Sequence, residues 1–338
     1  MAPTLVDRWW RDSAPETVEH DLSSLWRDVS SRGAVARAVM SNLVVFRLHE
    51  RRQGDRRAPE QATDVEAIIA LHPSRAIVIE QAHGVHAPGA PIGAGVAVCV
   101  FGSPAAQYGV EQVLIESASG EASLPSIVRR FVRGDVPTSV WWTEDLSQVP
   151  PLASLVTMGR QLIYDSRCWQ HVGTGIQRLA PLLENDDLDL ADLNWRRLTA
   201  LRRALADAAR ALPGSIAPPD VSIVHRGGDE ALALLLAGWL AARLRWERGA
   251  WPAIALAGQA ESGEHLVLTI TARGGALRAV MNDHRVEITA PDAAPLTVPV
   301  PDDSEATAIA AELRSLSFDS ALRETLEVLV RGLPNRHR

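Results

Sequence analysis

The chain has 338 residues, of which 46% are hydrophobic and 22% are charged, close to the averages of soluble globular proteins. Its formal net charge is −7 with acidic and basic residues intermixed, so no basic field marks it as a nucleic-acid binder. All 34 Lys and Arg positions are arginine, which excludes a Walker-type phosphate loop and a lysine Schiff base.

The sequence shows no sign of secretion or membrane insertion. Residues 1–21 carry charges every few positions and lack the apolar core of a signal peptide. The longest uncharged apolar run, Ala231–Ala242, is shorter than the roughly 20 residues that span a bilayer. Cys99 and Cys168 do not suggest a disulfide framework. We therefore expect a cytoplasmic protein that binds neither a membrane nor nucleic acid.

Strands rich in Val and Ile alternate with helical segments in the first half of the chain. Helices are expected at 14–32, 63–72, 123–135 and 151–161, and strands at 42–48, 76–81, 94–103, 111–119, 138–142 and 162–166. This alternation indicates an α/β fold with a largely parallel sheet. The successive strands within 95–119 imply that the sheet is mixed.

The second half of the chain follows an acidic run and has the same alternation. A long helix is expected at 193–212, closed by prolines and glycine up to Pro219. Strands are then expected at 221–226, 252–258, 265–274 and 276–289, and helices at 231–247, 304–315 and 320–331. We predict two α/β domains with mixed, largely parallel sheets, at 1–181 and 215–338, joined by an acidic segment and connector helix at 182–214.

No glycine-rich stretch has the form of a cofactor loop. Gly93–Gly95 precedes its strand, which is the wrong order for a dinucleotide-binding turn, and Gly173–Gly175 lacks the third glycine. Gly227 and Gly228 lie between a strand and a helix, where backbone N–H groups can bind an anion. Asp229 and Glu230 already place negative charge at the start of the expected helix, where it stabilises the helix dipole. A capped turn is therefore the preferred interpretation. We predict no cofactor.

Metal and catalytic sites are not predicted either. His83 and His86, with His72 upstream, lack the further ligands that a zinc site needs. Cys168 has no complete catalytic arrangement around it, and a packed or idle cysteine is the preferred interpretation. The adjacent carboxylates Glu144 and Asp145 lack the separate environments that general acid–base catalysis requires.

The expected helix at 193–212 has one apolar stripe and one basic face. Arg196, Arg203 and Arg210 lie almost opposite the leucines, and Trp195 lies beside the stripe in the first turn. This face is either an ordinary solvated surface or a ridge that binds a partner, since tryptophan and arginine are frequent in interface hot spots.

Several segments, taken in order and spacing, resemble the OpcA family, the glucose-6-phosphate dehydrogenase assembly proteins of cyanobacteria, actinobacteria and some other bacteria. The resemblance covers roughly residues 40–206, and the later residues agree with the family only in general layout and length. The matching segments are SNLVVF (41–46), LHPSRAIVI (71–79), SLPSIVRRFVRGDVPTSVWWTEDL (123–146), LIYDS (162–166) and DLNWRRLTALRRALA (192–206).

The resemblance implies a non-catalytic assembly factor and allosteric activator. It would bind glucose-6-phosphate dehydrogenase and promote its active oligomer in the oxidative pentose phosphate pathway. A packing role in the core is the alternative for every residue that we expect to contact this partner. These residues are Trp141, Trp142, Glu144, Asp145, Asp165, Ser166, Asn194, Trp195 and Arg196.

Two other functions remain open, a purely structural scaffold and a sugar-phosphate-binding sensor or α/β enzyme. In the second, the ligand lies at the carboxyl ends of the strands, where open α/β sheets bind ligands. Asp165 and Ser166 would take part in it. The candidates for binding the anion are His72, Arg75, His225 and Arg226.

The two adjacent tryptophans give a prediction that depends only on strand geometry. Neighbours on a strand point to opposite faces, so Trp141 and Trp142 should pack under different helical layers, or one of them should contact a partner.

Overall fold

A computed structural model describes most of the chain. The described residues are 3–49, 63–82, 92–103, 105–117, 124–208, 220–246, 255–258, 260–261, 263–272, 275–291, 293–301, 304–315 and 318–333. His83, His86 and Arg210, which the sequence singled out, lie outside these ranges. Within them, no helix is both long and apolar enough to cross a membrane.

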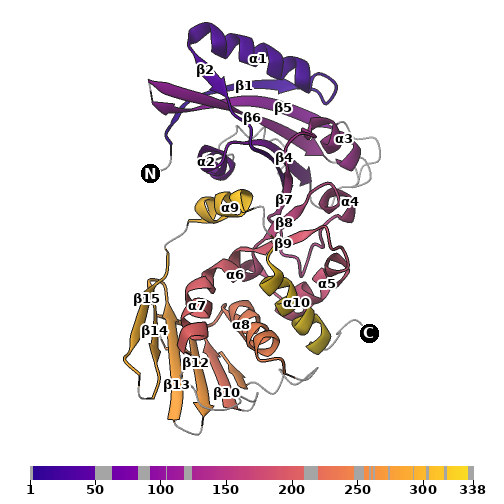
Figure 1. Ribbon diagram of the computed structural model, residues 1–338. Helices are drawn as coiled ribbons and strands as arrows, with labels where there is room; N and C mark the ends of the chain where they lie inside the picture. The colour runs from indigo at the N-terminus through magenta and orange to yellow at the C-terminus, as the bar shows by residue number, and fades with distance from the viewer. Residues whose placement is uncertain are drawn as a thin grey trace.

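The larger of two sheets has nine strands in the order β1-β5-β6-β4-β3-β7-β8-β9, with β2 paired to β6 (Figure 1). From β6 through β9 along this order every pairing is parallel, whereas β5 is antiparallel to both β1 and β6. The expected α/β fold with a mixed, largely parallel sheet is confirmed here. Its strands are β1 (Leu5–Ser13), β2 (Val35–Arg37), β3 (Ser41–His49), β4 (Ser74–Ala82), β5 (Gly93–Ser103), β6 (Ala106–Ser117), β7 (Thr138–Trp142), β8 (Gln161–Tyr164) and β9 (Asp189–Asp192).

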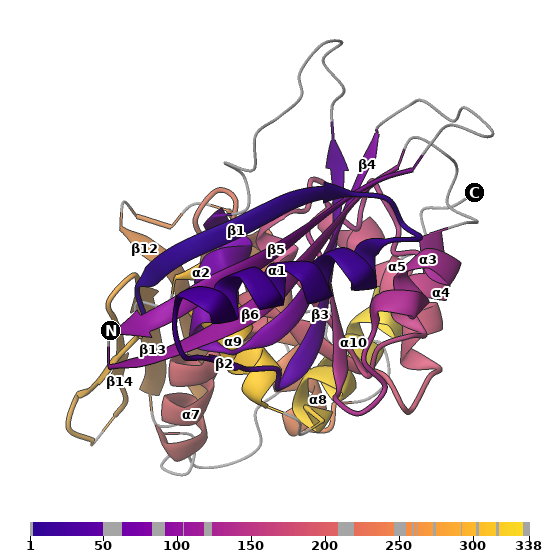
Figure 2. The same ribbon diagram turned by 90° about the horizontal axis from the view of Figure 1, so that it is seen from above.

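Helices cover both faces of this sheet, because its central strands are apolar on both sides. One face packs against α1, which crosses several strands in the view from above (Figure 2), and against α3, α4 and α5. The other face packs against α2 and the distant α9. These helices are α1 (Val18–Arg32), α2 (Thr63–Leu71), α3 (Leu124–Phe131), α4 (Ala153–Val156), α5 (Val172–Leu183) and α9 (Glu305–Arg314).

The smaller sheet has six strands in the order β11-β10-β12-β13-β14-β15 and is mostly antiparallel. Only β10 and β11 pair in parallel, which differs from the expected largely parallel sheet. The segment 276–289 reverses at Asp283 and His284, where the Asn282 side chain accepts N–H groups from the turn. The strands are β10 (Val221–His225), β11 (Ala255–Ala257), β12 (Glu264–Ala272), β13 (Gly275–Asn282), β14 (Arg285–Thr289) and β15 (Leu296–Pro299).

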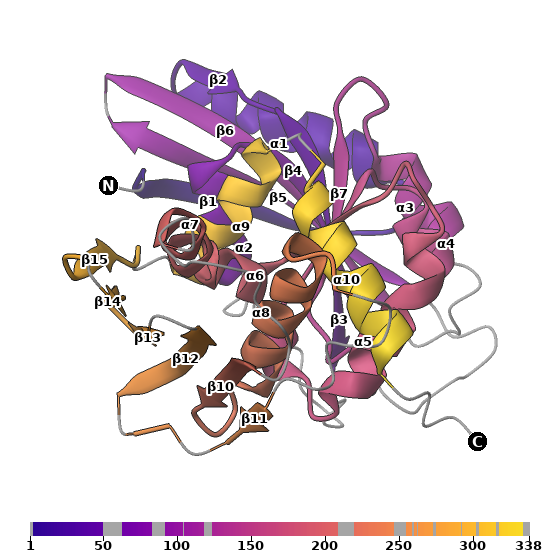
Figure 3. The same ribbon diagram turned by 60° about the horizontal axis from the view of Figure 1, so that its bottom comes forward.

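The expected long helix at 193–212 is interrupted in the structure. It forms α6 (Leu193–Arg197) and α7 (Thr199–Ala208), with Leu198 between them. Just before α6, the acidic run contributes β9 to the edge of the larger sheet. Helix α8 (Glu230–Arg243) packs against β10, and α10 (Ser320–Gly332) packs against α8 and α5 (Figure 3). The division at 181 and 215 stays a prediction, and α9 and α10 return to elements of the first half.

Candidate functional site

Trp141 and Trp142 are both buried, at 3% and 1% exposure. Trp142 belongs to the core on the face of α1, where it stacks on Phe46 and its Nε1 donates to the Val149 carbonyl at 3.2 Å. Trp141 packs on the opposite face, under α2 and α9. The predicted split between the two helical layers is therefore confirmed. The rings themselves are covered, which favours the packing alternative for this pair.

Glu144 and Asp145, which follow the tryptophans, hold neighbouring loops in place. Glu144 Oε1 accepts the Leu48 N–H at 2.7 Å, at the end of β3. The two carboxylate oxygens of Asp145 accept the N–H groups of Ser147 and Gln170 at 2.7 and 2.8 Å. Both side chains remain partly exposed at the carboxyl edge of the sheet.

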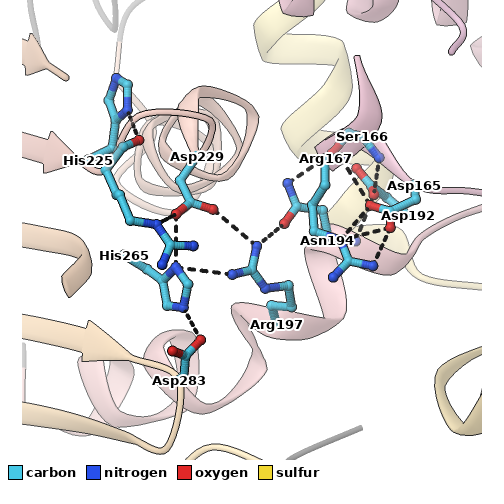
Figure 4. A network of polar contacts seen from close by, with 11 residues as sticks. Asp165, Ser166, Arg167, Asp192, Asn194, Arg197, His225, Asp229, His265 and Asp283 are labelled. Carbon is cyan, nitrogen blue, oxygen red and sulfur yellow. Dashed lines mark hydrogen bonds and ion pairs between the residues drawn. The ribbon is translucent and has the colours of Figure 1, made fainter. Parts of the chain in front are cut away.

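A buried carboxylate organises the ends of β8 and β9. Asp192 Oδ1 accepts the Ser166 N–H at 3.2 Å and the Asn194 N–H at 2.8 Å (Figure 4). Asn194 Nδ2 in turn donates to Ser166 Oγ at 3.1 Å. The structure thus brings together Asp165, Ser166 and Asn194, which were singled out from the sequence, around Asp192, which was not. Adjacent parallel strands cause this, because their carboxyl ends meet at one edge.

The pKa of Asp192 is raised to about 7, first because burial removes water from the carboxylate and second because Asp165 lies nearby. Its hydrogen bonds to Ser166 and Asn194 oppose this shift. Asp192 Oδ2 is buried and has no hydrogen-bond partner in the described part of the chain. One oxygen is therefore available to carry a proton near neutral pH.

Asp165 begins the short 3₁₀ helix η2 (Ser166–Cys168) and binds Arg167 through both carboxylate oxygens. Ser166 is buried, whereas Asp165 is partly exposed and Arg167 is exposed. Cys168 is exposed, and partial burial together with Asp165 raises the pKa of its thiol. The end of β8 therefore places at the surface the Asp165–Arg167 ion pair and the Cys168 thiol, whose pKa is raised.

Arg197 extends the polar network from the larger sheet to the smaller one (Figure 4). Its Nη1 lies 2.9 Å from Asn194 Oδ1 and 3.3 Å from Asp229 Oδ1. Its Nη2 lies 3.3 Å from His265 Nδ1. Asp229 precedes α8, and Arg226 Nε donates to it at 3.1 Å. One arginine on α6 therefore links the two halves of the fold.

His265 lies between two carboxylates and is 2% exposed. Its Nδ1 is 2.8 Å from Asp229 Oδ2, and its Nε2 is 2.5 Å from Asp283 Oδ1. Burial alone raises the pKa of Asp229, but the His265 hydrogen bond and the positive charges of Arg197 and Arg226 outweigh it and lower that pKa. Carboxylates from the start of α8 and from the β13–β14 turn therefore hold the imidazole ring of His265 from both sides.

Trp195 and Arg196 serve contacts within the chain. Trp195 is 3% exposed, and its Nε1 donates to Asp319 Oδ2 at 2.8 Å. Arg196 Nη1 bonds Glu312 Oε1 at 2.9 Å. These two residues join α6 to α9 and to the start of α10. Arg203 on α7 is exposed.

The four anion-binding candidates do not converge. His72 and Arg75 lie at the amino end of β4, so the expected position at the carboxyl ends of strands is wrong for them. Their sequence position explains this, because His72 precedes β4 and Arg75 is its second residue. Arg75 is buried and bonds Glu19 and Glu111. His225 and Arg226 lie at the carboxyl end of β10, in the other sheet.

A pocket of about 740 Å³ opens beside the network, between α6, α7 and the β13–β15 end of the smaller sheet. Arg197, His265 and Asp283 line it together with Arg167 and Arg203. Among the residues that the structure describes, no group of three or more His, Cys, Asp or Glu side chains is placed to hold a metal ion.

Fold and site together define a two-sheet α/β protein whose halves are joined by a buried polar network. The chain belongs to the OpcA family. Residues 65–181 match the family model described as the glucose-6-phosphate dehydrogenase subunit N-terminal domain. Residues 188–326 match the model of the corresponding C-terminal domain. The expected family is confirmed.

Two cyanobacterial relatives carry the name OxPP cycle protein OpcA. The Nostoc punctiforme protein is 31% identical over 158 residues, covering 46% of this chain and 32% of that protein. The Synechocystis protein is 28% identical over 126 residues, covering 36% and 26%. The matched region thus spans about a third or less of these relatives. A Gfo/Idh/MocA family oxidoreductase from Vibrio cholerae is 9% identical with a TM-score of 0.38, covering 86% of this chain and 96% of that structure.

Proposed function

We propose that this protein binds glucose-6-phosphate dehydrogenase and acts as a non-catalytic assembly factor and activator in the oxidative pentose phosphate pathway. The observation that carries the proposal is that both halves of the chain match models described as domains of a glucose-6-phosphate dehydrogenase subunit.

Activation by binding requires a higher affinity for the active form of the dehydrogenase than for its other forms. A rigid binding surface also loses little conformational entropy when it docks, which raises affinity. The network from Asp192 through Arg197 to Asp229 supports such rigidity, since it fastens the two sheets to each other.

The carboxyl edge of the larger sheet is the docking surface in this proposal. Five of the nine candidate contact residues are buried, namely Trp141, Trp142, Ser166, Asn194 and Trp195. The partly exposed ones are Glu144, Asp145, Asp165 and Arg196. The buried residues would shape this surface, and the exposed ones, with Arg167, would contact the dehydrogenase.

The test mixes the purified protein with the dehydrogenase of the same organism. We expect a shared elution peak in size-exclusion chromatography and faster NADP reduction at limiting dehydrogenase. Separate elution together with an unchanged rate would contradict the proposal.

A pair of variants locates the surface. Arg167→Ala removes an exposed arginine that pairs with Asp165, and we expect weaker binding. Arg285→Ala removes an exposed arginine that pairs with Glu287 on the smaller sheet, and we expect unchanged binding. An equal effect of both variants would place the docking surface elsewhere and leave the association itself standing.

A further inference from the structure

A second pocket, of about 610 Å³, lies where β9 meets α7, α8 and the start of α10. It adjoins the carboxyl-edge surface, with which it shares Trp195 and Arg196, and it has the size of a small-molecule site. Its lining includes the arginines Arg196, Arg202, Arg203 and Arg243 and the aromatic residues Trp195, Trp239 and Phe318.

Arg202 is the unusual member of this lining. Its guanidinium stacks on the Trp195 ring, 3.6 Å from the centroid. No carboxylate of the described residues lies within ion-pair distance of it. Among the described residues, its Nε is buried without an acceptor, and its Nη2 has a 3.4 Å contact with Thr199 Oγ1. A partly buried cation without a carboxylate partner is poorly compensated, so such a group is well suited to receive an anion.

The pKa of Arg202 is lowered to about 10, chiefly because of burial, with Arg203 and Arg243 adding repulsion and Asp319 opposing the shift. Three positive groups therefore share one small space. Arg203 is exposed and has no carboxylate partner among the described residues. Arg243 has a single 3.7 Å contact with the exposed Glu324, which water screens.

Carboxylates also line this pocket, but each has another partner. Glu312 pairs with Arg196 at 2.9 Å. Asp319 accepts the Trp195 Nε1–H and the Leu322 N–H, which begins α10. Asp189 Oδ1 accepts the Asp319 N–H at 3.3 Å.

The fourth carboxylate, Asp192, is directed toward Ser166 and Asn194. The lining is thus balanced in formal charge. Arg202 and Arg203 are its cations without a carboxylate partner among the described residues, and Asp192 Oδ2 is a lining oxygen without a hydrogen-bond partner there.

We propose that this pocket binds a phosphate group, either as inorganic phosphate or as part of a small phosphate ester. Arg202 would contact the phosphate, because a guanidinium fork matches phosphate geometry and Trp195 fixes its plane. Arg203 and Arg243 would complete the positive environment. Trp239 and Phe318 would offer apolar surfaces to the rest of an ester. The inference does not depend on the dehydrogenase.

The test uses the full chain and follows its thermal unfolding, since a ligand that binds only the native state raises Tm with its concentration. Inorganic phosphate, glucose 6-phosphate and glucose are compared with chloride at matched ionic strength. We expect both phosphates to raise Tm and glucose alone to have no effect. If Tm rises at lower concentrations of glucose 6-phosphate than of inorganic phosphate, the ligand is an ester. If Tm rises equally with both, the pocket recognises the phosphate group alone.

Arg202→Met tests the assignment, because it keeps length and apolar contact with Trp195 but removes the charge. We expect phosphate binding to weaken about tenfold or more, and the ligand-free Tm to stay the same or rise. Arg32→Met is the matched control, since Arg32 stacks on Trp9 at 4.1 Å in another part of the molecule. This control should keep the phosphate response.

Several results would overturn the proposal. One is a wild-type Tm that responds to phosphate no more than to chloride, and another is a full phosphate response in Arg202→Met. A lower ligand-free Tm of Arg202→Met would show that Arg202 is structural. If Arg202→Met does not fold, Arg203→Gln at the exposed neighbouring position is the test. We expect this variant to bind phosphate several-fold more weakly, and unchanged phosphate binding would contradict the site.

Discussion

Trp142 stacks face to face on Phe46, with ring centroids 4.0 Å apart and ring planes 1° from parallel. The two rings extend from adjacent parallel strands, where these residues are register partners. We expect Trp142→Ala to lower the free energy of unfolding by about 3–5 kcal/mol, because it removes a buried ring and leaves a cavity. Urea unfolding followed by circular dichroism measures this. Trp142→Phe keeps an aromatic ring and should cost clearly less, so equal losses in both variants would contradict a role for stacking and volume.

The contact between Arg197 and Asp229 should couple the two halves of the fold energetically. Both side chains are largely buried, and Asp229 also binds His265 and Arg226. We expect Asp229→Asn to lower stability by about 3–5 kcal/mol, because it leaves the largely buried Arg197 without a carboxylate partner among the described residues. A double-mutant cycle with Arg197→Met should give a coupling energy of about 1 kcal/mol or more. Additive effects would show that the 3.3 Å contact contributes nothing.

Asp192 should make stability fall as the pH rises. Its pKa is near 3.8 in an unfolded chain and about 7 in the fold, so between these values the folded protein binds the extra proton. Its contribution is therefore lost as pH rises from about 4 through 7. Relative to Asp192→Asn, the wild type should lose on the order of 4 kcal/mol between about pH 4 and pH 8. Urea unfolding of both proteins across this range measures the difference.

The asparagine variant is a close control for this pH effect. Its Oδ1 can still accept the Ser166 and Asn194 N–H groups, and other titrating residues such as Asp189 are present in both proteins. Parallel pH profiles for the two proteins would rule out an elevated pKa for Asp192.

The two cysteines should differ sharply in reactivity. Cys99 is fully buried, and burial raises the pKa of its thiol to about 12. Cys168 is exposed. We expect an aromatic disulfide reagent to titrate one thiol in the native protein and two after denaturation, because access and thiolate fraction control the reaction. Cys168→Ser should titrate none when native, and a rapidly reacting native thiol in that variant would contradict the buried position of Cys99.

Strand periodicity was sufficient to predict the centre of the larger sheet, because β3, β4, β7 and β8 are short apolar runs between clear turns. Several elements of the first half escaped it, namely β1, β2, β9 and α5. Strand β9 consists of Asp189–Asp192, whose aspartates look like a solvated loop although the strand is mostly buried. Helix α5 (Val172–Leu183) begins with glycines and contains Pro181, which weakens its helical pattern.

The polar network was only partly predictable. Asp165, Ser166 and Asn194 follow or flank strands that turned out to be neighbours, and strand ends are recognisable in sequence. Asp229, His265 and Asp283 converge because β12 pairs with β10 and because β13 pairs with β12, which places the β13–β14 turn beside His265. The β10–β12 pairing joins segments about 40 residues apart in the chain, and no local pattern encodes it.

The packing of α9 against α2 sets the order in which the fold can be completed during synthesis. Val65, Ile68 and Ile69 of α2 share their apolar cluster with Ile309 and Leu313 of α9, about 240 residues later. At roughly 5–20 residues per second, a ribosome needs roughly 10–50 s to cover that separation. During this time the nascent chain exposes an apolar face that its own later segment will cover. This part of the apolar cluster therefore closes only after α9 has been synthesised.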